Sequence, residues 1–190
     1  DLRAIPETEE ELQFISKLPI FNHSTLLLGN LATEKNIRNS DALRNAHVIS
    51  FATHGLLTGE IDGYSEPGLI LTNGSGDNND NGYLSMSEIV ELDIQAELVI
   101  LSACNTAGPQ TSGSNALSGI SSSFLAGGAE EVLATHWAID SVSTKELISI
   151  ILQEKSNSSQ PWAHAKKEGI KKFFNKFPQY QSPYYWGAFE

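Results

Sequence analysis

The sequence has a single cysteine, Cys104, among its 190 residues. One thiol cannot form a disulfide within the chain, and it cannot build a zinc site that needs several cysteines. Chains that do not depend on disulfides are typical of reducing compartments. We therefore expect a cytoplasmic protein.

Positive charge is also scarce. The chain has 12 Lys and Arg residues against 23 Asp and Glu residues, which gives a formal net charge of −11. Because phosphate backbones are bound by clustered positive charge, we expect no direct nucleic-acid partner. Five basic residues do share one segment with aromatic residues, and we interpret them as the wet face of an amphipathic helix rather than as a binding patch: Lys166, Lys167, Lys171, Lys172 and Lys176.

Long apolar runs are missing. A membrane-spanning helix needs about 20 apolar residues in succession, so we expect no membrane association. No signal-peptide pattern is visible, and the chain opens on Asp1 rather than on methionine, so we interpret it as a piece of a longer protein. Its length suits a single domain over residues 1–190, in which residues 1–18 form a leading helix or linker.

Apolar periodicity and turn signals alternate between strand-like and helix-like segments. Strands are expected at 24–28, 47–51, 69–72, 98–103, 131–137 and 182–189. Helices are expected at 1–18, 33–44, 84–92 and 114–126, followed by one capped by Ser143 with Glu146 and one that starts at Pro161. This alternation predicts a three-layer α/β fold in which helices flank a mainly parallel central sheet.

Two of these strands end next to reactive side chains. Leu98 to Ala103 has the composition of a strand buried on both faces, and it leads directly into Cys104. His47 to Phe51 is a similar apolar run that leads to His54. If the two strands are parallel neighbours, the imidazole and the thiol project from the same edge of the sheet, where open α/β sheets have their ligand sites. A glycine-rich loop, 56–68, is expected to follow His54.

An imidazole beside a thiol can perform nucleophilic catalysis. His54 would accept the thiol proton, Cys104 would attack a carbonyl carbon, and water would hydrolyse the resulting thioester. The backbone N–H groups of Gly55 and Cys104 are candidate oxyanion donors, and the chemical step needs no metal. The alternative is that Cys104 is a buried core cysteine and His54 a surface histidine.

Four motifs together resemble the CHAT domain, a family related to caspases and separase. They are ATHG at Ala52 to Gly55, LSACNT at Leu101 to Thr106, HWAID at His136 to Asp140 and PYYWGAF at Pro183 to Phe189. His54 precedes Cys104 by fifty residues, a separation also typical of caspases.

The resemblance implies a caspase-like sandwich and a cysteine endopeptidase that cleaves a protein or peptide substrate through Cys104 and His54. It also implies regulation by tetratricopeptide repeats or another region of a longer protein. Two alternatives stay open: a catalytically silent CHAT-like module that binds partner proteins, and an unrelated acyl-transfer enzyme that uses the same two residues.

The HWAID motif offers further site residues. His136 is an alternative base, although its more natural place is the rim of a substrate groove together with Trp137 and Asp140. In related peptidases an acidic residue in the first pocket selects basic side chains, so Asp140 could prefer Arg or Lys in the substrate. The alternative is that Asp140 only caps the following helix.

The segment Asp77 to Glu88 fits the calcium-binding pattern of an EF-hand loop. Its oxygen ligands would be Asp77, Asn79, Asn81 and Glu88, with Gly82 at the turn. Two features favour a flexible loop without a metal: the preceding residues do not predict an entering helix, and Ser85 with Glu88 forms a capping box for the next helix. The sequence therefore leaves two alternatives for this segment: a calcium site, or a flexible loop without a metal.

Overall fold

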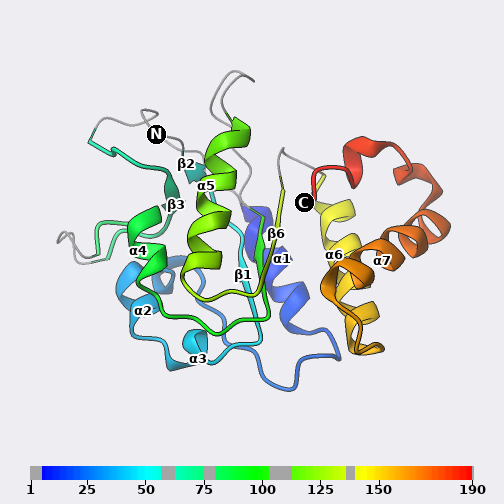
Figure 1. Ribbon diagram of the computed structural model, residues 1–190, viewed down its shortest axis with the longest axis horizontal. Helices are drawn as coiled ribbons and strands as arrows, with labels where there is room; N and C mark the ends of the chain where they lie inside the picture. Colours follow the sequence, from blue (N-terminus) through cyan, green and yellow to red (C-terminus); the bar gives the residue numbers. More distant parts are fainter. Residues whose placement is uncertain (1–5, 57–62, 75–79, 103–112, 136–139, 190) are drawn as a thin grey trace. The chain divides into compact units, whose positions relative to one another are not determined.

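A computed structural model describes residues 6–56, 63–74, 80–102, 113–135 and 140–189 (Figure 1). The chain divides into two compact units, one made of residues 27–138 and the other of residues 1–26 with 139–189. The expectation of one domain over 1–190 stays a prediction. None of the helices in the described residues has the length and apolar composition that crossing a bilayer requires.

A parallel sheet forms the centre of the first unit. Its strands are β1 (Val48–Phe51), β5 (Leu98–Leu101) and β6 (Glu131–Ala134), in the order β1-β5-β6. All four residues of β5 are buried, which confirms the prediction of a strand buried on both faces. The register aligns the last residues of the three strands, so that Phe51 lies beside Leu101 and Leu101 beside Ala134.

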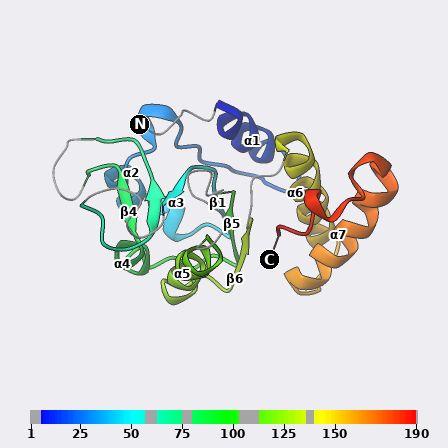
Figure 2. The same cartoon turned by 90° about the horizontal axis from the view of Figure 1, so that it is seen from above.

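Helices pack against one face of this sheet. The face presents Ile49, Phe51, Val99 and Leu101 to a core that includes Phe124, whose ring centroid is 5.2 Å from that of Phe51. The helices that contribute to this core are α2 (Glu34–Arg38), α4 (Met86–Val90) and α5 (Gly113–Ala126). Figures 1 and 2 show α4 and α5 side by side. A mixed α/β fold with a parallel sheet flanked by helices is thus confirmed, and the three-layer sandwich stays a prediction.

A second, antiparallel sheet was not predicted. Its strands, in the order β2-β3-β4, are β2 (Gly55–Leu56), β3 (Gly68–Ile70) and β4 (Tyr83–Ser85). The expected loop at 56–68 is therefore wrong at its two ends, since Leu56 and Gly68 are both strand residues. Strands of two or three residues are too short to show an alternating pattern. They are stabilised instead by burial of Leu56, Leu69 and Leu84.

A buried carboxylate holds the hairpin of β3 and β4. Glu34, the first residue of α2, is fully buried, and its Oε1 accepts hydrogen bonds from the N–H groups of Gly82 at 2.7 Å and Tyr83 at 3.1 Å. Its other oxygen, Oε2, has no hydrogen-bond partner among the described residues. Burial raises the pKa of Glu34 above the ordinary value of 4.5, and the nearby Glu88 adds to the rise while Arg38 opposes it.

The end of α5 is set by two glycines, as the sequence predicts. The N–H of Gly128 donates to the carbonyl of Leu125 and the N–H of Ala129 to the carbonyl of Phe124, which is the Schellman pattern. Gly128 has a φ of +111°, and a Cβ there would lie 2.0 Å from the carbonyl oxygen of Ile94. Only glycine fits this turn, which leads the chain from α5 into β6.

The second unit is helical. It contains α1 (Pro6–Ser16), α6 (Ser141–Ser156) and α7 (Trp162–Lys176), and both α1 and α7 pack against α6 (Figure 2). The predicted apolar residues of α6 are buried: Leu147, Ile148, Ile151 and Leu152. Gly169 of α7 lies against Ile151, and a Cβ at Gly169 would be 2.8 Å from Ile151 Cγ1.

The lysine-rich helix has the predicted amphipathic character. Trp162 and Phe173 are buried, while most of the lysines are exposed. Several of them are paired within the unit: Lys171 with Glu168, Lys172 with Glu154 and Lys176 with Glu146.

Three expected elements differ. Residues 24–28 form no strand, although Leu27 packs against the core. The expected helix at 33–44 is broken into α2 and α3 (Asp41–Arg44), because Ser40 caps a new helix start. The expected strand at 182–189 contains the 3₁₀ helix η3 (Pro183–Tyr185), since the Ser182 side chain accepts from the Tyr184 N–H and starts a turn. Two further 3₁₀ helices are η1 (Gly29–Leu31) and η2 (Pro178–Tyr180).

The glycine turn after α5 predicts a graded loss of stability. Gly63 also has a positive φ, +94°, but a Cβ there would have open space around it. We expect Gly63→Ala to lower the free energy of unfolding by about 1–2 kcal/mol through backbone strain alone. Gly128→Ala should cost about 1–3 kcal/mol more, because its Cβ collides with the Ile94 carbonyl. Urea unfolding of both variants measures the difference, and equal losses would contradict the collision.

The raised pKa of Glu34 predicts a pH-dependent stability. A carboxyl group with a higher pKa in the folded chain holds its proton more tightly there, so this stabilisation is complete below pH 4.5 and is lost as the pH rises through the raised pKa. Glu34→Gln keeps a carbonyl oxygen for the two backbone N–H groups but does not titrate. We expect the unfolding free energy of the wild type to fall relative to that of Glu34→Gln as the pH rises from about 4 to about 8. Urea unfolding of both proteins at several pH values in this range measures this change. A difference in unfolding free energy that stays constant with pH would contradict the prediction.

Candidate active site

The three parallel strands end level with one another. Beyond the paired residues, the N–H of Ser102 donates to the carbonyl of Phe51 at 2.8 Å, and the N–H of Thr135 donates to the carbonyl of Leu101 at 3.2 Å. The segments that leave β1 and β5 therefore start as hydrogen-bonded neighbours at one edge of the sheet. This confirms the predicted parallel pairing of the strands that precede His54 and Cys104.

His54 lies in the short segment of chain that joins β1 of the parallel sheet to β2 of the antiparallel sheet. It is the third residue after the end of β1 and the last residue before β2, and it is half-buried. Its carbonyl oxygen accepts a hydrogen bond from the N–H of Ile70 at 2.8 Å. The hydroxyl of the preceding residue, Thr53, donates to the carbonyl of the same Ile70. The backbone that carries the imidazole is thus bound to the end of β3.

The pairing of β2 and β3 determines where the Gly55 N–H points. In an antiparallel pair, hydrogen-bonded positions alternate with positions whose N–H groups face away from the partner strand. The bond from Ile70 to the His54 carbonyl makes that position a hydrogen-bonded one. The next pair, Gly55 with Leu69, is then a position at which the Gly55 N–H points away from β3. The Gly55 N–H therefore points away from β3, and its role as an oxyanion donor stays a prediction.

Other predicted residues lie outside the described residues. They are the nucleophile and second oxyanion donor Cys104, the groove residue Trp137 and the alternative base His136.

Asp140 is the N-cap of α6. Its Oδ1 accepts a hydrogen bond from the N–H of Ser143 at 2.9 Å, and its side chain is otherwise exposed. Asp140 therefore caps α6, and its contact with substrate stays a prediction. The capping box expected between Ser143 and Glu146 is wrong, because Ser143 lies inside the helix and its hydroxyl donates to the Asp140 carbonyl, while Glu146 pairs with Lys176.

The carboxylate of Glu88 is engaged without a metal. Its Oε2 accepts from the backbone N–H of Ser85 at 2.9 Å and from the Ser85 hydroxyl at 2.8 Å, which confirms the predicted capping box. Its Oε1 accepts from Arg38 at 2.7 Å. The twelfth residue of an EF-hand binds calcium through both oxygens, so calcium at Glu88 would replace these contacts, and the calcium site stays a prediction.

Of the remaining predicted calcium ligands, only Asn81 lies within the described residues. The side-chain oxygen of Asn81 accepts from the Tyr83 N–H, and Asp77 and Asn79 lie outside the described residues. Within the described ranges, no group of three or more His, Cys, Asp or Glu side chains is arranged to hold a metal ion.

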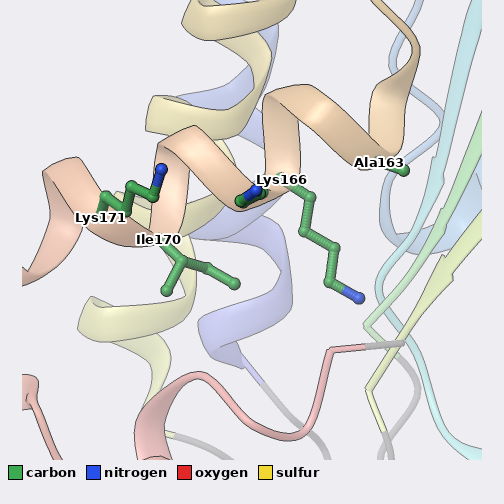
Figure 3. Close-up of a pocket in the computed structure, with 5 residues that line it drawn as sticks. Ala163, Lys166, Ile170 and Lys171 are labelled. Carbon is green, nitrogen blue, oxygen red and sulfur yellow. The ribbon is translucent and has the colours of Figure 1, made fainter.

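A surface hollow of about 420 Å³ lies along α7 (Figure 3). Its lining residues all belong to this helix: Ala163, Lys166, Lys167, Ile170 and Lys171. They include no thiol, imidazole or carboxylate, so the hollow lacks the groups for the chemistry expected of His54 and Cys104.

Sequence reasoning overlooked two residues: Thr53, which precedes the candidate base, and Glu34, which binds the hairpin of β3 and β4. Thr53 is part of the ATHG motif, but its partner Ile70 belongs to a strand whose pairing the sequence does not show. Glu34 was overlooked as well, because a glutamate in a polar stretch gives no sign that it is buried. The short apolar run from Leu69 was the one available signal that a strand lies beside His54.

Comparison with protein-family models identifies the family of the chain. A search of curated proteins finds nothing similar to the chain. The family model described as CHAT domain matches residues 2–190, which is almost the whole sequence. The chain therefore belongs to the CHAT domain family.

Proposed function

We propose that this chain is a cysteine endopeptidase in which Cys104 is the nucleophile and His54 the general base. The observation that carries the proposal is the register of β1 and β5, which pairs Phe51 with Leu101. His54 follows Phe51 by three residues and Cys104 follows Leu101 by three. Membership of the CHAT family, which is related to caspase-like peptidases, supports the same chemistry.

The reaction uses the two side chains in turn. His54 takes the proton from the Cys104 thiol, and the thiolate attacks the carbonyl carbon of the substrate peptide bond. The oxyanion that forms accepts hydrogen bonds from the N–H groups of Gly55 and Cys104. When the C–N bond breaks, His54 returns the proton to the leaving amine. Water then hydrolyses the thioester and releases the free thiol.

Membership of the family supports a proposed substrate class and a proposed mode of regulation. We propose a protein substrate, and control of the site by tetratricopeptide repeats or another region of a longer protein. The alternative, a silent module that only binds partners, would keep the fold and lose the chemistry, so activity measurements separate the two.

Substitution of Cys104 and His54 tests the proposed catalytic pair directly. In the full-length protein with its flanking regions attached, Cys104→Ala should lower cleavage of a peptide library by about three orders of magnitude or more. His54→Ala should lower it by about 10²–10⁴-fold, the usual contribution of general acid–base catalysis. His47→Ala is the matched control, because His47 is an exposed histidine at the amino end of β1. Cleavage that survives Cys104→Ala would rule out the mechanism, and a wild type without cleavage would favour the binding module.

The second prediction separates the two roles of Asp140. We propose that its carboxylate, besides capping α6, selects Arg or Lys before the cleaved bond. Asp140→Asn keeps an oxygen for the Ser143 N–H and removes the charge, so stability should be preserved while the basic preference is lost. Asp140→Ala should in addition lower the unfolding free energy by about 1 kcal/mol, because the cap is lost. Retention of the basic preference in Asp140→Asn would leave capping as the sole role.

A further inference from the structure

The segment that carries His54 is held by two hydrogen bonds to one residue. The carbonyl oxygen of Ile70 accepts a hydrogen bond from the Thr53 hydroxyl, and the N–H of Ile70 donates to the His54 carbonyl. Residues 52–54 lie between β1 and β2 and belong to neither strand. Their direction therefore depends on a few specific bonds rather than on a regular ladder.

Ile70 itself is firmly placed. It pairs with Tyr83 across the hairpin, and the next residue, Leu71, donates its N–H to the Gly82 carbonyl at 2.9 Å. The N–H groups of Gly82 and Tyr83 are bound in turn by the buried carboxylate of Glu34. Hydrogen bonds of the hairpin therefore link Ile70 to Glu34 of α2.

A general base must be held within a fraction of an ångström of its partner to act efficiently. The backbone bond between Ile70 and His54 fixes one point of the segment. The Thr53 hydroxyl supplies a further point one residue earlier, which limits rotation of the peptide unit between Thr53 and His54.

We propose that Thr53 is a positioning residue, whose hydroxyl, bound to the Ile70 carbonyl, orients the backbone of His54 toward the nucleophile. The inference rests on the proposed function, because it assigns Thr53 a role through His54. It adds a residue that does not touch the substrate and acts by fixing the direction of the imidazole.

Cys104 provides a readout that needs no substrate. It is the only thiol among these 190 residues, and mass spectrometry of the peptide that contains it follows alkylation by iodoacetamide at this residue alone. The thiolate is the reactive form, and a well-placed imidazolium lowers the pKa of a neighbouring thiol. Displacement of His54 should therefore move the pH profile of alkylation upward.

The test compares four variants of the full-length protein with the wild type. His54→Ala is the reference for complete loss of the imidazole. Thr53→Val removes the hydroxyl at nearly constant shape, and Thr53→Ser restores it. Thr72→Val is the matched control, because the Thr72 hydroxyl also donates to a backbone carbonyl, that of Gly29, but is not bonded to the His54 segment. Thermal unfolding of each variant checks that it folds.

We expect Thr53→Val to lower the alkylation rate at about pH 6 by about tenfold, as an upward shift of one pKa unit does while the thiol is mostly protonated. Thr53→Ser and Thr72→Val should keep the wild-type profile. If His54→Ala shifts the profile and Thr53→Val does not, the positioning role is wrong while the proposed pair stands. If His54→Ala leaves the profile unchanged, the proposed pair itself fails.

Discussion

The parallel pairing of β1 with β5 is the constraint on which the candidate site depends. β5 is buried on both faces, so the N–H and carbonyl groups along its backbone must find partners in the neighbouring strands β1 and β6. That requirement fixes the pairing of the strands, and the register of this pairing brings the ends of β1 and β5 level. A shift by one residue would move the core side of each strand to the opposite face, which the buried Phe51 and Leu101 oppose.

The antiparallel sheet adds a second constraint. β1 brings the chain to the edge of the parallel sheet, but β2 and β3 determine how the chain leaves it. Ile70 makes bonds to both Thr53 and His54, and Glu34 holds the hairpin behind Ile70. The burial of the ionisable Glu34 side chain costs stability. The hydrogen bonds that it accepts from two backbone N–H groups offset part of that cost. The buried carboxylate of Glu34 thus holds the backbone of the hairpin of β3 and β4 against α2.

Local signals in the sequence were sufficient for part of this structure. The apolar run of β5 and the glycine pair after α5 predicted their elements, because the physical cause lies within a few residues. The capping box of Ser85 and Glu88 was also predicted, since both bonds join residues three apart. The same motif failed at Ser143, because Asp140 three residues earlier was the stronger start of α6.

Bonds between distant segments were not predictable in this way. Glu34 and Gly82 are 48 positions apart, and Thr53 and Ile70 are 17 apart, so no local pattern joins them. β2 and β4 are too short to show a period, and their residues were therefore assigned to a loop and to a helix. His54 and Gly55 could be named as candidate site residues from the ATHG motif, and a strand was expected at 69–72, but its pairing beside them could not be predicted.

The register of β1 and β5 also has a consequence for biosynthesis. Each paired residue in this ladder is separated from its partner by fifty positions of chain. A ribosome that adds about 5–20 residues per second needs about 3–10 s to make that length, so β1 is complete well before its partner exists. During this interval the edge of the sheet has not formed. A nascent chain therefore carries His54 without the neighbour that the finished fold provides, and the proposed chemistry cannot begin before β5 has been made and has paired with β1.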